Sequence, residues 1–261
     1  MKKFYVVGNR ASKSLSPIIF NYWFNKYKIN ANYGYLQLNN YNFDSKIIKI
    51  LSKKNTYGLN ITIPFKQKII KHLDVLDKHS RSINAVNCVS INNKIKGYNS
   101  DWEGFYKTIP KIKNIKNKNI ILIGYGGAAL AIHYVLKLKG YKNIIIINRT
   151  KKKLQFEKKR KYTLKFENLY KHLPEAKLII NTTPINPFNQ KNKKLINNKT
   201  VISDIVYKPK ETGFLKLFPN NKKIYGISML LEQATPCFKL WFGFKPSIDL
   251  KLIKILNKKI K

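Results

Sequence analysis

Three closely spaced glycines follow a run of branched apolar residues near the middle of the chain. Ile120 to Ile123 leads into Gly124-Tyr125-Gly126-Gly127-Ala128-Ala129, after which an amphipathic segment of helical length begins. A glycine at 124 permits a tight turn, one at 126 lets the backbone approach a bound group, and a small residue at 129 lets the helix pack close to the strand. The first N–H groups of such a helix attract anions. The pattern predicts that Gly124, Gly126, Gly127 and Ala128 bind the pyrophosphate of a dinucleotide.

The end of the next apolar run indicates which dinucleotide would bind. Ile144 to Ile147 is followed by Asn148-Arg149-Thr150, with Lys153 nearby. An NAD-binding protein places Asp or Glu at this point, about 20 residues after the glycines, and that acid would repel a 2′-phosphate. Arg149 instead offers a planar fork, Thr150 a hydroxyl and Lys153 a further cation. We therefore expect NADP, held by Asn148, Arg149, Thr150 and Lys153. A solvated arginine in a basic chain is the alternative.

A second group of residues could transfer a proton. A strand that ends at Thr62, followed by a proline turn, would present Lys66 at its carboxyl end, where open α/β sheets build their sites. The ammonium of a lysine can stabilise an alkoxide and donate a proton to it. Lys66 alone carries little information among so many lysines, but Asp101 is one of only 12 acids. Asn60 and Thr62 could hydrogen-bond the hydroxyl groups of a ligand.

Short apolar runs predict the strands that would position these residues. They are Phe4 to Val7, Tyr33 to Leu38, Gly58 to Thr62, Ala85 to Ile91, Ile120 to Ile123, Ile144 to Ile147, Leu178 to Ile180, Val201 to Val206 and Lys223 to Tyr225. The later runs are almost unbroken, which is typical of a parallel sheet covered on both faces. Because helical segments lie between several of them, the sequence favours an α/β doubly wound plan.

Two helices carry clear boundary signals. Ser16 could cap a first helix that has Pro17 in its first turn. A second helix, Ala128 to Lys139, should end at Gly140. The lysine-rich segment Lys151 to Leu173 is only weakly periodic, and the sequence leaves open whether it keeps regular structure.

The charge of the chain raises the question of a nucleic-acid partner. Of 261 residues, 52 are Lys or Arg and 12 are Asp or Glu, which gives a formal net charge of +40. The lysines are spread over nearly every segment, alongside heavy use of Asn and Ile, and no nucleic-acid-binding motif accompanies them. We therefore expect no nucleic-acid partner. A positive surface would still steer anionic substrates toward a site.

The cysteines and the apolar segments bear on the compartment. Cys88 and Cys237 lack CxxC spacing and a neighbouring His cluster, so we expect buried free thiols and no metal site. The apolar run Phe4 to Val7 is too short for a signal peptide. The uncharged stretch Asn119 to Leu136 contains glycines and fits strand, turn and helix better than a membrane span. We expect a cytoplasmic protein that makes no contact with membranes.

Ordered motifs between Val7 and Phe242 resemble those of the shikimate dehydrogenase family. They are Ser14-Leu15-Ser16-Pro17, Gly58 to Lys66 (N-x-T-x-P-x-K), Ala85-Val86-Asn87, Gly97 to Gly104 (G-x-N-S-D-x-x-G), Asn181-Thr182-Thr183-Pro184, Asp204 to Tyr207, and Gly226 to Met229 leading to Gln233. The resemblance weakens only in Lys151 to Leu173 and at the C-terminal tail. Two positions depart from the family pattern: Ser100 replaces a threonine and Ser228 a glycine.

The resemblance implies a reaction and a set of contacts. Hydride would pass from NADPH to the ketone carbon of 3-dehydroshikimate, Lys66 would donate a proton or hydrogen bond to the oxygen, and Asp101 would orient Lys66 and bind an adjacent hydroxyl. The implied substrate-binding residues are Ser14, Ser16, Asn60, Thr62, Asn87, Tyr207 and Gln233. Further implied cofactor contacts are Thr182, Gly226 and Met229.

The resemblance also implies two α/β domains with the active cleft between them. Residues 1–102, completed by 227–261, would bind the substrate, and residues 103–226 would form a Rossmann-like NADP-binding domain. Three alternatives remain: a quinate/shikimate dehydrogenase that uses NAD, a basic nucleic-acid-binding protein that kept an α/β shell, and an enzyme that has lost its activity. The sequence leaves open whether the chain forms a homodimer.

Overall fold

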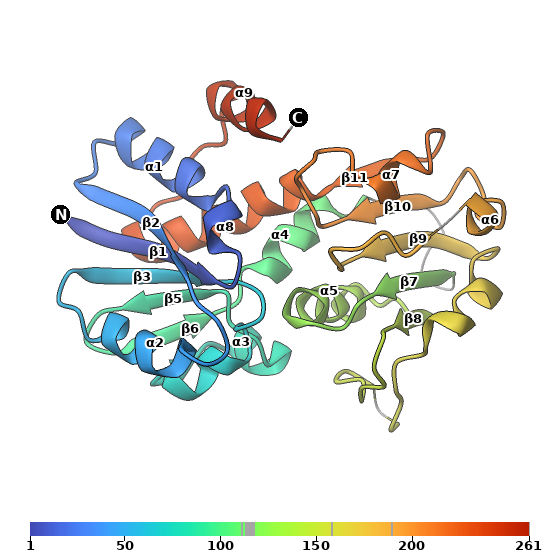
Figure 1. The fold of residues 1–261 in the computed structure, drawn as a ribbon, viewed down its shortest axis with the longest axis horizontal. Helices are drawn as coiled ribbons and strands as arrows, with labels where there is room; N and C mark the ends of the chain where they lie inside the picture. Colours follow the sequence, from blue (N-terminus) through green and yellow to red (C-terminus); the bar gives the residue numbers. More distant parts are fainter. Residues whose placement is uncertain (111, 113–117, 158, 189, 261) are drawn as a thin grey trace. The chain divides into compact units, whose positions relative to one another are not determined.

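The chain folds into two compact units (Figure 1). The computed structural model describes residues 1–110, 112, 118–157, 159–188 and 190–260. Unit 1 comprises Met1–Glu103 and Gln233–Leu256, and unit 2 comprises Gly104–Glu232 and the end of the chain from Asn257. No helix among the described residues is long and apolar enough to span a membrane.

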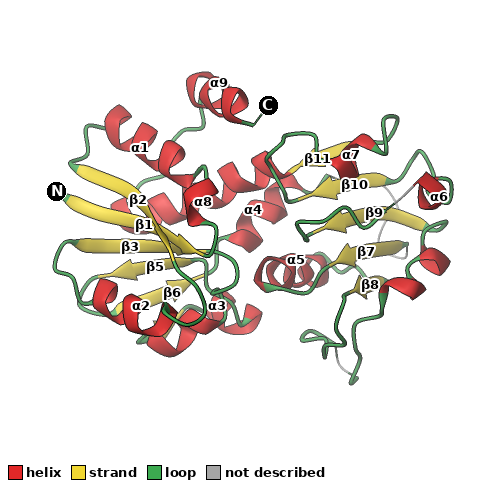
Figure 2. Ribbon diagram, viewed as in Figure 1, coloured by secondary structure: helices red, strands yellow, loops and turns green. Residues whose placement is uncertain are grey.

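Unit 1 is built on a six-stranded mixed sheet with strand order β2-β1-β3-β5-β6-β4 (Figure 2). Its elements are β1 (Lys2–Gly8), α1 (Ser16–Lys26), β2 (Ala31–Gln37), α2 (Phe43–Leu51), β3 (Thr56–Ile61), β4 (Val75–Leu76), α3 (Lys78–Ile83), β5 (Cys88–Ile91) and β6 (Ile95–Tyr98), with 3₁₀ turns at Ala11–Lys13 and Lys68–His72. β1 and β3 are parallel, whereas β5 runs antiparallel to both β3 and β6. The carboxyl ends of β1, β3 and β6 therefore share one edge with the amino end of β5.

The two faces of this sheet are covered by different helices, because alternate residues of a strand point to opposite faces. Phe4 of β1 packs among rings of α1 and of α8 (Gly226–Phe242), with centroids 5.5 Å from Phe24 and 4.8 Å from Trp241. Val7 points to the other face and belongs to a core that includes Phe43 of α2. Because both faces of the sheet are buried, polar residues that face a ligand are left to the ends of its strands.

Unit 2 is built on a five-stranded sheet with strand order β11-β10-β9-β7-β8, and every neighbouring pair is parallel (Figure 2). Its elements are β7 (Asn119–Ile123), α5 (Gly127–Leu138), β8 (Ile144–Ile147), β9 (Ala176–Asn181), α6 (Gln190–Lys193), β10 (Val201–Asp204), α7 (Gly213–Lys216) and β11 (Lys223–Tyr225). The α/β class and the parallel sheet predicted from the sequence are confirmed. The strand order reverses between β7 and β9, and doubly wound sheets bind ligands beyond the carboxyl ends of the strands at such a point.

Helix α5 matches the prediction closely. It begins one residue before Ala128 and ends at Leu138, and Gly140 beyond it adopts φ +77°. A glycine in the left-handed region ends a helix without strain, so the predicted stop is confirmed.

The segment Lys151 to Leu173 has no α-helix among its described residues. It contains two short 3₁₀ turns, Phe166–Asn168 and Tyr170–His172, and isolated strand bridges. Leu169 and Leu173 are nevertheless buried in the core of unit 2. The segment therefore covers part of the sheet with side chains rather than with a helix. The remaining helices, α4 (Asp101–Thr108) and α9 (Leu250–Lys259), contain unit boundaries, as does α8.

Two local predictions in unit 1 are wrong. Helix α1 begins at Ser16, but the Ser16 side chain makes no capping hydrogen bond; Ser14 Oγ instead accepts from Ser16 N at 3.2 Å. Strand β5 begins at Cys88 rather than Ala85; Asn84, which ends α3 in a left-handed conformation at φ +55°, lies four residues earlier. In addition, the apolar pattern does not predict β6, whose centre is Lys96-Gly97.

Unit 2 buries a histidine on α5. His133 is 0% exposed, and burial lowers the pKa of its imidazole to about 4, although Glu157 nearby favours the charged form. The unfolded chain takes up this proton near pH 6.5, whereas the folded chain does so only near pH 4. The contribution of neutral His133 to stability is therefore complete above about pH 6.5 and is lost as the pH falls toward 4.

We expect the wild-type protein to lose about 3 kcal/mol more unfolding free energy than His133→Gln between pH 7 and pH 4. Glutamine can still accept a hydrogen bond from Tyr125 but does not titrate, so the other titrating groups contribute equally to both proteins. Urea unfolding at a series of pH values measures the difference. Parallel pH curves would contradict the assignment of this proton to His133.

Candidate active site

The strand directions of unit 1 bring three distant residues to one edge of its sheet. Lys66 lies five residues beyond the end of β3, Asp101 three residues beyond the end of β6, and Asn87 one residue before β5 begins. Because β3 and β6 run in the same direction on either side of β5, these ends are adjacent. The backbone ties them further, since Val86 N donates to Lys66 O at 2.7 Å.

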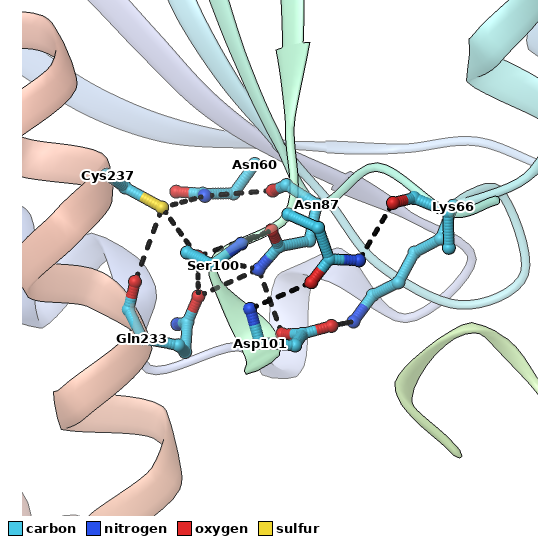
Figure 3. Close-up of polar contacts among 9 residues, drawn as sticks. Asn60, Lys66, Asn87, Ser100, Asp101, Gln233 and Cys237 are labelled. Atoms are coloured by element: carbon cyan, nitrogen blue, oxygen red, sulfur yellow. Dashed lines mark hydrogen bonds and ion pairs between the residues drawn. The ribbon is translucent and has the colours of Figure 1, made fainter. Parts of the chain in front are cut away.

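Lys66 and Asp101 form a buried ion pair (Figure 3). Lys66 Nζ lies 2.5 Å from Asp101 Oδ2, and the two residues are 9% and 5% exposed. Within the described part of the chain, Asp101 is the only partner bonded to the ammonium, which leaves two of its three N–H groups for other acceptors. The pair can therefore present an oriented ammonium to an oxygen atom of a ligand.

The other oxygen of Asp101 is held by an amide. Asn87 Nδ2 donates to Asp101 Oδ1 at 2.9 Å, and it also lies 2.9 Å from Ser100 Oγ and 3.1 Å from Gln233 Oε1. In return, Ser100 N donates to Asn87 Oδ1 at 2.6 Å. Asn99 Oδ1 accepts from Asp101 N at the start of α4. The carboxylate is thus fixed by two neighbouring side chains, one of them the ammonium, and Asn99 fixes the backbone that carries it.

Asn60 is joined to this network through the backbone of Asn87. Tyr33 OH donates to Asn60 Oδ1 at 2.7 Å, while Asn60 Nδ2 donates to Asn87 O at 3.0 Å and lies 3.2 Å from Cys237 Sγ. Both amide hydrogens are used, so Asn60 can meet a ligand only through its oxygen. Cys237 and Cys88 are buried thiols, as predicted, and burial raises the pKa of Cys88 well above its usual value.

The remaining polar residues of the same edge follow β1 and β3 in the chain. Ser14 Oγ lies 3.1 Å from Ser16 Oγ, so the two hydroxyls predicted to bind a carboxylate are adjacent. Thr62 follows β3, and a Cβ added at Gly8 of β1 would overlap its side chain. Gly8 therefore makes room for Thr62 at the end of β1. The structure brings Ser14 and Ser16 to one point and Lys66, Asn87, Asp101 and Gln233 to another within unit 1.

The glycine turn of unit 2 has the geometry of a phosphate site. Gly124 follows β7 with φ +94°, and a side chain there would overlap Thr182 Oγ1 and lie 2.9 Å from Thr183 Cγ2. Gly126 precedes α5, and an added Cβ would meet no atom within 4 Å. Gly124 is thus required by the fold, whereas Gly126 faces open space at a helix N-terminus. Open space at this end of a helix suits an anion, because the free N–H groups of the first turn and the helix dipole favour negative charge there.

The loop after β8 carries the cations expected to select the cofactor. Asn148 Oδ1 accepts from Tyr125 N at 3.1 Å, and Asn148 Nδ2 donates to Thr150 O at 2.8 Å. The loop is therefore bonded to the glycine turn. Arg149 and Lys153 are exposed. An exposed guanidinium at this place can bind a dianionic phosphate without the cost of a buried unpaired charge.

Four further predicted residues lie on unit 2. Thr182 follows β9 and donates to Ile123 O at 2.7 Å, beside the glycine turn. Tyr207 follows β10 and is half-buried. Gly226 begins α8, where a side chain would overlap the backbone oxygen of Ile205, and Met229 is buried one turn later. Thr182 thus lies beside the glycine turn, while Tyr207, Gly226 and Met229 lie near the ends of β10 and β11.

Three residues of the unit 1 network were not predicted as site residues. Ser100 and Asn99 precede Asp101 in the same motif, so adjacency to a charged residue was the available signal. Cys237 lies four residues after Gln233, which places both on one face of α8. The sequence offered that spacing, but nothing in it indicated that Asn60 lies against the same thiol.

Comparison with known protein families identifies both units. Residues 6–89 match the family model described as the shikimate dehydrogenase substrate-binding domain. Residues 108–207 match the model described as shikimate/quinate 5-dehydrogenase. Together these matches span more than half of the chain.

Relatives along the whole chain carry the same description. Proteins called shikimate dehydrogenase (NADP(+)) from Pelagibacter ubique and Methanococcus vannielii are 35% and 34% identical to it. The alignments cover 98% and 97% of this chain and 99% and 95% of those proteins. A crystal structure of a shikimate dehydrogenase in complex with NADP+ superimposes with a TM-score of 0.84 at 30% identity, covering 100% of this chain and 96% of that one.

Alanine at the two turn glycines should separate folding from dinucleotide binding. We expect Gly126→Ala to cost less than about 1 kcal/mol of stability, because the methyl group meets open space, but to weaken dinucleotide binding by about tenfold or more. Gly124→Ala should cost about 2 kcal/mol or more, because φ +94° strains any residue with a Cβ. Chemical denaturation and calorimetric titration with NADP+ measure the two effects. Normal binding by Gly126→Ala would exclude this turn as the pyrophosphate site.

Proposed function

The chain belongs to the shikimate dehydrogenase family, and from this we infer that it catalyses the reversible reduction of 3-dehydroshikimate to shikimate by NADPH. This reaction lies on the shikimate pathway to chorismate and the aromatic amino acids. The structural observation that best supports the inference is the buried ion pair of Lys66 and Asp101, held by Asn87 at the edge of the unit 1 sheet. The matching relatives are NADP-dependent enzymes, and the glycine turn with Arg149 after β8 agrees with that cofactor.

The two units divide the work in this proposal. A substrate-binding domain of residues 1–102 and 227–261 corresponds to unit 1 except in α8 and at the end of the chain, and residues 103–226 form the NADP-binding domain. NADP would be held by the turn at Gly124, Gly126, Gly127 and Ala128, by Asn148, Arg149, Thr150 and Lys153, and by Thr182, Gly226 and Met229. When bound as NADPH, it supplies the hydride that the ketone carbon receives.

Lys66 deals with the charge that the reaction creates. As the ketone carbon becomes tetrahedral, its oxygen gains negative charge, and an N–H of Lys66 donates to it and delivers the proton. Asp101 directs the ammonium, because its Oδ2 binds one N–H and fixes where the other two point. Since Asn87 holds Oδ1, the carboxylate cannot rotate away from Lys66 without breaking a second hydrogen bond. Preorganisation of this kind lowers the barrier without reorganisation during the step.

The other substrate contacts follow the polarity of the ligand. Ser14 and Ser16 present adjacent hydroxyls to the carboxylate of the substrate. Thr62, Asn87 and Gln233 surround the ring hydroxyls, and Asn60 contributes only an acceptor oxygen. Tyr207 of unit 2 is proposed as the remaining contact.

The setting of the enzyme is also a proposal. We propose that the protein works in the cytoplasm on small molecules and binds no nucleic acid. If it were instead a nucleic-acid-binding protein, its affinity for DNA at physiological salt would be submicromolar and dehydroshikimate would not be reduced. Whether it acts as a monomer or as a homodimer can be read from its mass in solution.

Removing either member of the ion pair should abolish most turnover. We expect Lys66→Ala and Asp101→Asn each to lower kcat for 3-dehydroshikimate reduction by about 100-fold or more, because the developing oxyanion loses its oriented donor. The KM for NADPH should change little. Lys68→Ala is the matched control, since Lys68 is a half-buried lysine whose ammonium contacts Asn40 O, Asp44 and the ring of Phe43, none of which belongs to the ion-pair network. Initial rates of NADPH oxidation, with circular dichroism as a check on folding, make the test. Near-normal rates in both folded variants would refute these roles.

The charge of +40 should make the encounter with substrates depend on salt. Both 3-dehydroshikimate and NADPH are anions, so we expect kcat/KM to fall by roughly threefold to tenfold as ionic strength rises from 0.02 to 0.3 M. The value of kcat at saturation should stay nearly constant, because screening acts on the approach of the ligands. Initial rates at several salt concentrations give both quantities. A kcat/KM that is independent of salt would show that the spread charge does not steer these ligands.

A further inference from the structure

We propose that Tyr125, the second residue of the glycine turn, is a positioning residue that fixes the loop Asn148–Gln155 and thereby sets the preference for NADP over NAD. The inference rests on the proposed function, because it assumes that this loop receives the 2′-phosphate. Tyr125 acts through the loop rather than by contact with the 2′-phosphate. Tyr125 determines where the cations of the loop, Arg149 and Lys153, lie.

The backbone of Tyr125 is bonded to the loop at two points. Tyr125 N donates to Asn148 Oδ1 at 3.1 Å, and Tyr125 O accepts from Lys152 Nζ at 3.2 Å. Arg149 lies between these two contacts in sequence. The turn that receives the pyrophosphate and the loop that carries the cations are therefore connected directly.

The side chain of Tyr125 adds a buried anchor at the far end of the loop. Tyr125 is 4% exposed, and its hydroxyl lies 3.0 Å from Gln155 N and 3.0 Å from His133 Nδ1. Gln155 N can only donate, so the hydroxyl must donate to His133, which must then be neutral with its proton on Nε2. Burial supports this, because it raises the pKa of Tyr125 and lowers that of His133 to about 4.

The loop is paired along its length with the segment that follows it, through bonds such as Leu154 N to Lys161 O and Thr163 N to Lys152 O. These bonds hold the two segments to each other, and the contacts of Tyr125 tie the pair to the glycine turn and to α5. Arg149 has no hydrogen-bond partner among the described residues, so its position follows that of the loop. Loss of the Tyr125 hydroxyl would leave Gln155 N and His133 Nδ1 without their partner, and the loop would shift to satisfy them.

The test is binding of two fragments that differ only in the 2′-phosphate, 2′,5′-ADP and 5′-AMP. Calorimetric titration of Tyr125→Phe should show about tenfold weaker binding of 2′,5′-ADP and less than about twofold weaker binding of 5′-AMP. Tyr141→Phe is the matched control, a buried tyrosine of the same unit beyond the other end of α5. It should leave both affinities as in the wild type.

A second pair of variants keeps the test open if Tyr125→Phe does not fold. Gln155 is exposed, so Gln155→Pro removes the N–H that binds the hydroxyl, and Gln155→Ala keeps it. Gln155→Pro should lower the ratio of the affinity for 2′,5′-ADP to the affinity for 5′-AMP by about as much as Tyr125→Phe does. Gln155→Ala should leave this ratio unchanged. Equal weakening of both fragments, or an unchanged ratio in both Tyr125→Phe and Gln155→Pro, would overturn the inference.

The outcome separates the inference from the proposed reaction. A wild-type protein that prefers 2′,5′-ADP but does not reduce 3-dehydroshikimate would overturn the proposed reaction and leave the role of Tyr125 standing. A wild-type protein that binds both fragments equally would overturn the role of Tyr125, even if it reduced 3-dehydroshikimate with NADH.

Discussion

A charge that leaves water must find a partner, and this requirement governs the arrangement around Lys66. Burying an ammonium or a carboxylate alone costs several kcal/mol, so neither Lys66 nor Asp101 could lie at the sheet edge without the other. The pair in turn requires Asn87, because the second carboxylate oxygen needs a donor. The polar residues of unit 1 are therefore not independent contributions to a site. Each one is needed because the preceding one is buried.

The sheet meets this requirement through strand direction rather than through proximity in sequence. Thirty-five residues separate Lys66 from Asp101. They meet because β5 turns back between β3 and β6, so that two carboxyl ends and one amino end share an edge. Gly97 of β6 allows this close packing, since a Cβ there would lie 2.5 Å from Leu73 Cδ1 and 2.9 Å from Val86 Cγ2. The same Gly97 weakens the strand pattern in the sequence, which is why β6 could not be predicted.

The sequence predicts best where one local cause decides the structure. Strands β8 and β11 have their predicted bounds, because short runs of branched residues between polar ones have few alternatives. Gly140 ends α5 for an equally local reason. The prediction fails where side chains compete: Ser14 and Ser16 can both serve the start of α1, and only the folded chain shows that the hydroxyl of Ser14 does so. Likewise, the motif names Asn60, but its contact with Cys237 depends on how α8 packs.

In a chain with 52 cations and 12 acids, almost any carboxylate can lie near a cation. The number of cations that each acid actually contacts is therefore informative. Asp44 binds His72, Lys68 and Lys71, and these partners hold the pKa of its carboxyl far below the usual value. Asp204 is the contrary case: it has no ion pair among the described residues, and burial raises its pKa. Its carboxylate accepts hydrogen bonds from Thr212 and Val206 instead, at the end of the strand that leads to Tyr207. Asp204, which has no cation beside it in the described part of the chain, holds a loop through hydrogen bonds, whereas Asp101 binds and orients the single ammonium of Lys66.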